Sequence, residues 1–447
     1  MVNIDNRRNP RNTDSKTKKK PARKVTEGIL KETDARDPVS LYKLFITDKV
    51  LSHIVEATNT YAKCCSMHNS SVEHFMCNDN WDSLTVEELR IFLFYHQIKD
   101  ILLYNNIKDM WCTESIIIKG QTKKITKTRY YSILNHIYFN AVKESIDSDT
   151  DPAIKVTKVI HMITRNFKRA VKVGHVISID ESALTKDGQI IIDHPTDGKC
   201  VPHRVDVFKM CSKDGYTFDW GVLVSAQSAS IDIDRINNVI NKLLSGLLYK
   251  KKRVYTGSRI TNFILANTLL AQSTYLCGKV VANAEYLPTD RQYLQKKGDY
   301  VTLSNLTGIK LFKWTNNYTR FMLSTFKEHK GRVVNIYNNS NNIDVGEDYD
   351  KSTQGISLTD HIETFYNSTH KISEWYRTVI LHLMCNTAIF NAWYIYRTFT
   401  TGSMTLLEFK ICLVEDALGI EMQLDIDFTK DHINMWEKYF STWLADE

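Results

Sequence analysis

The hydrophobic pattern changes its period twice along the chain, and this constrains the fold more than any other feature of the sequence. From Asp37 to about residue 172, apolar residues recur at the three- and four-residue steps of helices. Residues 173–284 contain short β-branched runs typical of strands, which alternate with helical stretches. Residues 351–417 return to the helical period. This order predicts an α/β protein whose mixed-sheet core is preceded and followed by helical regions.

Two central segments carry more specific patterns. Val205 to Cys211 and Tyr216 to Ser225 flank the turn Lys213-Asp214-Gly215, which predicts a β-hairpin. Residues 285–350 are rich in Asn, Thr, Tyr and Lys with short strand-like runs, so we expect a β-rich insertion there. Its last acidic residues are expected in a polar loop: Asp344, Glu347, Asp348 and Asp350.

Val379 to Tyr396 is the most apolar long stretch, yet it contains His382 and Asn386 and stops at Arg397. A bilayer span needs about 20 predominantly apolar residues. We therefore expect a buried core helix and no membrane partner.

Residues 1–36 differ from the rest because basic residues crowd a segment almost without aromatic side chains. Such a segment cannot bury enough apolar surface to fold, so a disordered basic tail is expected. Its run from Lys16 to Lys24, with Lys18, Lys19 and Lys20 at its centre, is typical of a nuclear address or a phosphate-binding arm. A solvated tail without a specific role is the alternative.

The net charge of the whole chain is +7, which is compatible with a polyanionic partner but does not require one.

The helix expected over residues 154–172 is amphipathic and basic. Its residues Arg165, Lys168 and Arg169 are candidates for contacts to the DNA backbone. A solvated helix face explains the same residues equally well.

A short cysteine- and histidine-rich segment has the spacing Cys-Cys-x2-His-x5-His-x2-Cys from Cys64 onward. Cys65, His68, His74 and Cys77 have the side chains that zinc prefers. Because the spacing matches no known zinc motif, buried thiols and surface imidazoles are the favoured interpretation.

The strand Val176-Ile-Ser-Ile179 ends in Asp180-Glu181-Ser182. An acidic residue at a strand end, facing out of an α/β core, is where metal-dependent nucleic-acid enzymes place their first carboxylate. Asp180 is therefore the first candidate for a catalytic residue.

Together with motifs before and after it, this strand end resembles the piggyBac transposase family, and the resemblance extends over roughly residues 40–415. Many short motifs match in order, and their number makes the resemblance specific. They include Leu44-Phe45, Trp81 with Thr85 to Leu89, Arg129-Tyr130-Tyr131, Ile179 to Ser182, Gly215-Tyr216, Leu287-Pro288, Lys313-Trp314, Trp375, and Asn391-Ala-Trp-Tyr-Ile-Tyr396.

The resemblance implies an RNase H-like core with a β-rich insertion, a helical front for dimerisation and DNA binding, and a catalytic Asp triad. The first Asp matches Asp180, but the second and third positions fall on Gly257 and Ser357. A further Asp of the family matches Asp360. Two of the three triad carboxylates are thus replaced.

Other departures agree with this loss. Two positions that hold arginine in the family are Val281 and Ala284, and a Gly-Arg pair becomes Gly188-Gln189. Arginine is the residue that clamps phosphates bidentately. The chain stops at Glu447 without a cysteine-rich zinc-binding tail, so we expect that DNA-recognition module to be absent.

These patterns together predict a transposase-like protein that has lost catalysis and acts as a DNA-binding or transposase-partner accessory protein in the nucleus. The expected partners are DNA and a second copy of the chain or a transposase-like protein, and no cofactor is expected. One alternative is an active nuclease that binds Mg²⁺ through Asp180, Asp360 and another acid. A second alternative is a protein-interaction module that does not bind DNA.

The same patterns suggest the division of the chain. The expected parts are a disordered basic tail (1–36), a helical dimerisation and DNA-binding region (37–172), the first part of the core (173–284), the β-rich insertion (285–350), the helical second part of the core (351–417) and a C-terminal helical segment (418–447).

Overall fold

Strands from the centre of the chain form one nine-stranded mixed sheet in a computed structural model. The described residues are 36–67, 81–101, 111, 124–141, 151–182, 184, 190–196, 199–226, 232–281, 300–315, 319–331, 333–336, 340–365, 374–400, 404–420 and 422. The strand order is β2-β3-β1-β5-β6-β9-β8-β7, and β4 pairs with the other edge of β3. The strands are β1 (Val176–Glu181), β2 (Ile190–Thr196), β3 (Lys199–Ser212), β4 (Thr217–Ala226), β5 (Arg253–Thr256), β6 (Tyr275–Val280), β7 (Tyr300–Ser304), β8 (Lys310–Thr315) and β9 (Thr319–Ser324).

The centre of this sheet combines a hairpin with parallel strands. β3 and β4 form the predicted hairpin, and its turn holds Gly215 at a φ of 93°. β1 pairs antiparallel with β3 and parallel with β5, and β5 pairs parallel with β6. Because β1 and β5 run in the same direction, the ends that carry Asp180 and Gly257 meet at one edge of the sheet.

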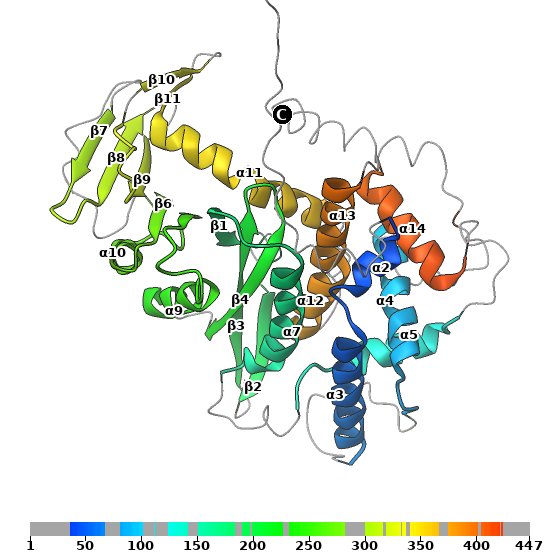
Figure 1. Cartoon of the computed structure of the whole chain (residues 1–447). Coiled ribbons are helices and arrows are strands. Elements are labelled where there is room, and N and C mark those ends of the chain that lie inside the picture. The colour runs from blue at the N-terminus through cyan, green and yellow to red at the C-terminus, as the bar shows by residue number, and fades with distance from the viewer. Residues whose placement is uncertain are drawn as a thin grey trace, which may run out of the picture.

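The strands of the expected insertion continue the core sheet. β9 pairs antiparallel with β6, and β8 and β7 follow outward (Figure 1). A separate two-stranded sheet joins β10 (Val333–Ile336) to β11 (Ser340–Ile343). The insertion is therefore tied to the core by a strand ladder.

A long helix begins where a polar loop was expected. α11 runs from Asp344 to Phe365, so the loop prediction for residues 344–350 is wrong. The Asp344 carboxylate accepts hydrogen bonds from the backbone N–H groups of Lys330 and Gly331. These contacts fix the helix start to a distant turn, which the local sequence does not reveal.

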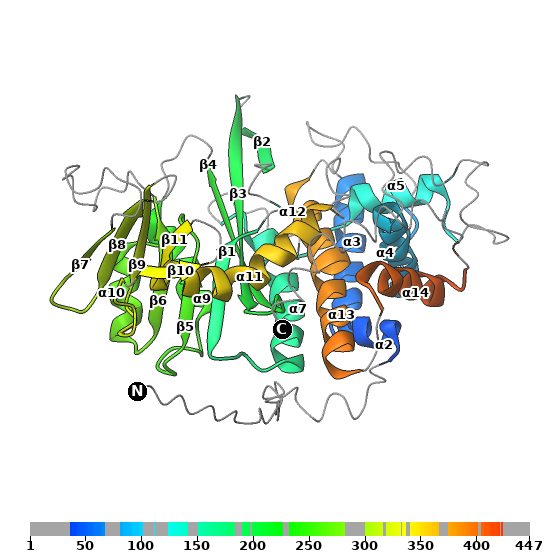
Figure 2. The same ribbon diagram turned by 90° about the horizontal axis from the view of Figure 1, so that it is seen from above.

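Helices gather on the side of the sheet away from β7–β9, as both views show (Figures 1 and 2). They are α2 (Pro38–Lys43), α3 (Asp48–Met67), α4 (Val86–Ile101), α5 (Lys127–His136), α7 (Ile154–Ala170), α12 (Trp375–His382), the π-helical turn η4 (Leu383–Thr387), α13 (Ala388–Phe399) and α14 (Leu406–Leu418). α9 (Ile233–Leu243) packs on β4, and α10 (Phe263–Ala271) packs on β6. The predicted helix over 154–172 is confirmed as α7.

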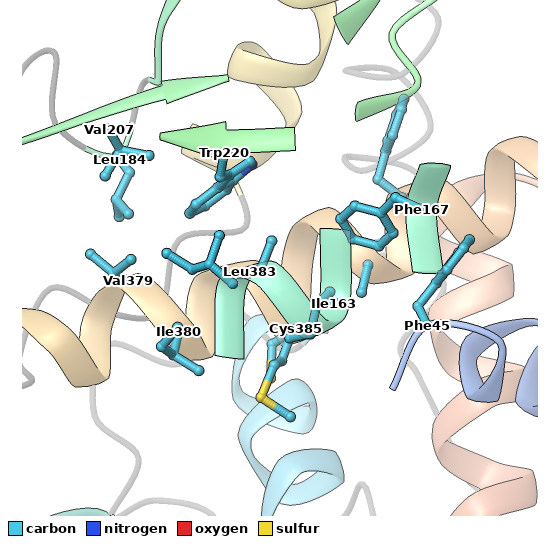
Figure 3. Packing of buried hydrophobic residues seen from close by; sticks show 14 of the residues in the cluster. Phe45, Ile163, Phe167, Leu184, Val207, Trp220, Val379, Ile380, Leu383 and Cys385 are labelled. Carbon is cyan, nitrogen blue, oxygen red and sulfur yellow. The ribbon is translucent and has the colours of Figure 1, made fainter. Parts of the chain in front are cut away.

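The continuous helical stretch Trp375–Phe399 forms the centre of the helical half. By length and composition it could cross a membrane, but its most apolar window is 100% buried inside the protein. Val379 and Leu383 point toward Trp220 of β4, whereas Ile380 points to the other side of its helix, and all four belong to the hydrophobic core (Figure 3). This is the position of a core helix, as the sequence predicted.

Opposite faces of the sheet receive different helices. Val239 and Leu243 of α9 pack against Gly221, which pairs with Phe208 of β3. α11 covers the other face, where the Ser178 hydroxyl donates to the carbonyl oxygen of Ser352. Since neighbouring residues of a strand point to opposite faces, Asp180 shares the face of α11 and Glu181 shares the face of α9.

Candidate functional site

Asp180 lies at the end of β1, half-buried, at the position predicted for the first carboxylate. Its Oδ1 accepts a hydrogen bond of 2.9 Å from the backbone N–H of Glu181. Burial, reinforced by the charge of Asp180, raises the pKa of the Tyr349 phenol on α11. The carboxylate therefore lies under α11, at the edge where a metal site would form.

Gly257 directly follows β5 and lies beside Asp180. Its N–H donates to the carbonyl oxygen of Ile179, and its own carbonyl accepts from the Thr261 hydroxyl at 2.8 Å. A Cβ atom at residue 257 would lie 2.7 Å from Oδ2 of Asp180 and closer still to Oδ1. The Asp180 carboxylate thus occupies the space that a side chain at residue 257 needs.

Ser357 is an exposed residue in the middle of α11. Its hydroxyl carries no charge, so this position supplies no anionic ligand. Asp360 lies three residues further along the same helix, and the structure brings it to the sheet.

Asp360 forms an ion pair with Lys209, which sequence reasoning missed. Lys209 Nζ lies 2.6 Å from Oδ1 of Asp360, and the lysine side chain is 0% exposed. The same ammonium donates to the hydroxyl of Thr359 at 3.3 Å. Lys209 is also the ladder partner of Asp180 in β3, so a buried cation shares the sheet face with both remaining acids. The available signal was a lysine between Phe208 and Met210 in an otherwise apolar strand.

Two divalent metal ions need several oxygen ligands with negative charge. The residues present do not fit such a centre, because position 257 has no side chain, Ser357 is neutral and Asp360 is paired with Lys209. Within the described residues, no group of three or more His, Cys, Asp or Glu side chains is arranged to hold a metal ion.

The acids at the start of α11 are engaged elsewhere. Asp348 accepts a hydrogen bond of 2.6 Å from the Tyr255 hydroxyl and contacts Nε2 of His329 at 3.0 Å. Burial alone would raise the pKa of Asp348, but the bonds from His329 and Tyr255 lower it below its ordinary value. Asp344 binds the backbone of another turn. These carboxylates have structural roles.

A charged cluster lies on the opposite face, directly behind the candidate site, and sequence reasoning also missed it. Arg259, two residues after Gly257, contacts Glu181 and donates to Oδ1 of Asp206 at 2.9 Å. Arg204 donates to the same Oδ1 at 2.8 Å. Burial and the charge of Asp206 raise the pKa of Glu181 to about 7, although Arg259 and Arg204 oppose the shift. The cluster joins β1, β3 and the loop after β5.

The predicted DNA contacts on α7 are on the surface. Arg165, Lys168 and Arg169 are exposed, and Lys168 forms an ion pair with Asp219 of β4. A groove of about 500 Å³ between α7, β4 and α9 is lined by Lys168 together with Arg235 and Lys242. α7 therefore presents cations to solvent, as the contact hypothesis requires.

Several predicted residues fall outside the described part of the chain. Lys18, Lys19 and Lys20 of the basic tail belong to this group, as do His68, His74 and Cys77 of the zinc candidate. Cys65 is buried near the end of α3. The tail and the zinc candidate remain predictions.

Three comparisons relate the chain to known proteins. The family described as "Transposase IS4" matches residues 37–393. PiggyBac transposable element-derived protein 5 of Homo sapiens is 22% identical over 251 residues, which are 54% of this chain and 46% of that protein. The chain thus spans about half the length of that relative.

The third comparison is with a solved structure. A cryo-EM structure of a piggyBac transposase synaptic complex with hairpin DNA superposes with a TM-score of 0.67, covering 90% of this chain and 82% of that chain. The sequence identity is 15%, so this likeness concerns the fold. The predicted fold class is confirmed.

Proposed function

The chain belongs to the piggyBac family of transposases, and from this premise we propose that it is a DNA-binding accessory protein without DNA-cutting activity. The observation that carries this proposal is the contact between Asp180 and Gly257. The Asp180 carboxylate fills the space that a carboxylate at residue 257, the second triad position, would need. Residues 180 and 257 therefore cannot hold two metal ions between them.

The fate of the other acids supports the proposal. Breaking a buried ion pair costs about 3–5 kcal/mol, so Asp360 is expected to stay with Lys209 when divalent metal is added. Without a pair of metal ions, the residues that the structure describes supply no group that would activate water and stabilise the leaving 3′ oxygen.

DNA binding is the activity that needs no triad. The exposed cations of α7 and the basic tail suit phosphate contacts, which depend on charge. The related solved structure is a complex with hairpin DNA. We therefore propose DNA as the ligand and the nucleus as the location. A second copy of the chain or a transposase-like protein is the proposed protein partner.

Strand cleavage tests the loss of activity. The full chain is incubated with supercoiled and hairpin DNA in Mg²⁺ or Mn²⁺, beside its Asp180→Ala variant and an active piggyBac transposase as positive control. We expect no nicking above the level of Asp180→Ala. Cleavage that Asp180→Ala abolishes would overturn the proposal and support the alternative of a rearranged acidic site that uses Mg²⁺.

Binding is measured separately by fluorescence anisotropy with a labelled duplex. We expect affinity that falls steeply as salt rises. A chain that shows no salt-dependent retention of DNA would instead support the alternative of a protein-interaction module.

A further inference from the structure

A second basic surface lies at the edge of the sheet opposite the candidate site. It comprises residues from the loop before β1, the turn before β5 and the first residue of β5, and we call it the basic edge: Lys172, His175, Lys250, Lys251, Lys252 and Arg253. β1 starts at Val176 and β5 at Arg253, four residues before Asp180 and Gly257 respectively. At about 3.3 Å per residue, this places the two edges roughly 13 Å apart along the strands.

The charge of the basic edge has little compensation in the chain around it. From Arg235 to Ala284 the sequence contains no Asp or Glu. Lys250, Lys251 and Lys172 are exposed, while Arg253 pairs with Glu328.

The electrostatics of the loops agree with this. Burial lowers the pKa of Lys252, and the charges of Lys250 and Lys172 lower it further. Burial also lowers the pKa of His175, helped by Arg253 and Lys252. Mutual repulsion of this kind is relieved when an anion binds.

The backbone of the turn before β5 is held in an unfavourable conformation. Tyr249 and Lys251 have φ angles of 60° and 52°, and Ser273 in the adjoining turn has 48°. These are the three non-glycine residues with positive φ in the part of the chain that the structure describes. Non-glycine residues rarely adopt this region, and such strain clusters at functional sites.

Hydrogen bonds hold the strained turn rigidly. Lys252 Nζ donates to the carbonyl oxygens of Val173 and Gly174 at 3.0 and 2.6 Å. The backbone N–H of Tyr249 donates to the carbonyl of Gln272 at 2.9 Å. Lys252 is therefore the anchor, and the exposed Lys250 and Lys251 are presented on a fixed loop.

We propose that the basic edge binds the phosphate backbone of a duplex DNA segment distinct from any segment at the Asp180 edge. The proposal rests on the proposed DNA-binding function and assigns it a surface. Lys and Arg supply the charge, and the Tyr249 phenol, 70% exposed, can donate to a phosphate oxygen as such side chains do. Lys172 follows Arg169 by three residues, so the basic edge continues the cationic end of α7.

The test compares variants of the full chain by anisotropy with a labelled 30-base-pair duplex over a salt series. Each phosphate contact contributes about 0.9 to the slope of log K against log salt. Lys250→Glu with Lys251→Glu should weaken binding at least about tenfold and flatten the slope by about 2. The matched control is Lys124→Glu with Lys127→Glu, an exposed pair at the start of α5 in the helical half with the same change of charge, which should leave the slope unchanged.

A second variant separates binding from folding. Lys251→Gly removes one charge but suits the positive φ better, so its melting temperature should equal or exceed that of the parent while the salt slope flattens by about 1. Weaker binding by a variant that is at least as stable cannot come from misfolding.

The outcomes distinguish this inference from the proposed function. If the full chain binds duplex with a steep salt dependence but both basic-edge variants behave like the control, the basic edge is not the surface and DNA binding stands. If the full chain does not bind duplex, both proposals fail. If the variants lose binding only to vesicles that contain phosphatidylserine, the ligand is a membrane surface and the DNA assignment is overturned.

Discussion

Gly257 and Asp180 show how a residue without a side chain affects the position of its neighbour. In a two-metal site, carboxylates on adjacent strands must diverge enough to leave room for the ions. Here residue 257 has no side chain, so the Asp180 carboxylate fills the space beside it, and a backbone N–H from Glu181 holds the carboxylate there. Introducing an acid at residue 257 therefore requires Asp180 to move as well.

A double-mutant cycle tests this packing. Gly257→Ala should destabilise the fold by about 1–2 kcal/mol, because its Cβ displaces the Asp180 carboxylate from the Glu181 N–H. In the Asp180→Ala background the same change should cost less than about 0.5 kcal/mol. Urea denaturation of the four proteins gives the coupling energy. Additive effects would show that the two residues do not share this space.

At the scale of elements, α11 depends on a contact between two backbones. Gly355 packs on the turn of the β3–β4 hairpin, where a Cβ would lie 2.7 Å from the carbonyl carbon of Lys213 and closer still to the backbone N of Gly215. That turn is closed by a hydrogen bond of 3.1 Å from the Gly215 N–H to the Ser212 carbonyl. α11 also carries Asp360 to Lys209, so its seating on the hairpin positions the ion pair.

Gly355→Ala should therefore destabilise the protein by about 2–3 kcal/mol, more than Gly257→Ala, because a backbone cannot rotate away as a side chain can. Gly174→Ala is the control, since a Cβ there would meet nothing within 4 Å. We expect that control to change stability by less than about 1 kcal/mol. Urea denaturation gives the free energy of unfolding of both variants and of the parent. Equal effects of the two substitutions would contradict the packing argument.

The elements also show which parts of the fold follow from local sequence. α7 and the β3–β4 hairpin were predicted because their periodicity and turn residues act within a few positions. The start of α11 was not, since Asp344 is held by the distant residues Lys330 and Gly331. The ladder between β6 and β9 is likewise a long-range pairing.

The candidate site likewise contains residues that local sequence locates and residues that only long-range contacts bring together. Asp180, Gly257 and Ser357 were located by motif order, and the structure places Asp180 against Gly257. The ion pair of Lys209 with Asp360 and the cluster around Arg259 join elements distant in sequence. Pairings of this kind leave only a weak trace, such as one lysine in an apolar strand.

At the scale of the whole molecule, both faces of the sheet carry buried charged side chains near the ends of the strands. One face carries Lys209 with Asp360, and the other carries Glu181 and Asp206 with Arg204 and Arg259. These pairs connect the hairpin, the parallel strands and α11. The fold therefore has a charged centre that contributes to stability, and its titratable groups link stability to pH.

Glu181 gives that link a sign. Its pKa rises from an ordinary value of 4.5 to about 7 in the folded protein because of burial and the charge of Asp206. The folded state thus holds a proton that the unfolded state has released, so the stability contributed by protonated Glu181 is complete below about pH 4.5 and is lost as pH rises to about 7.

Glu181→Gln mimics the protonated form and removes this dependence. Relative to the parent, the variant should gain on the order of 1–3 kcal/mol between pH 5 and pH 8. Urea denaturation across that range measures the difference in free energy of unfolding. The control is Glu347→Gln, in the exposed ion pair of α11, whose curve of stability against pH should run parallel to that of the parent. If the stability curve of Glu181→Gln instead runs parallel to that of the parent, Glu181 is ionised throughout this pH range and is held as a carboxylate by Arg259 and Arg204. In that case the cluster behind the candidate site would be a plain ion-pair network, insensitive to pH in this range.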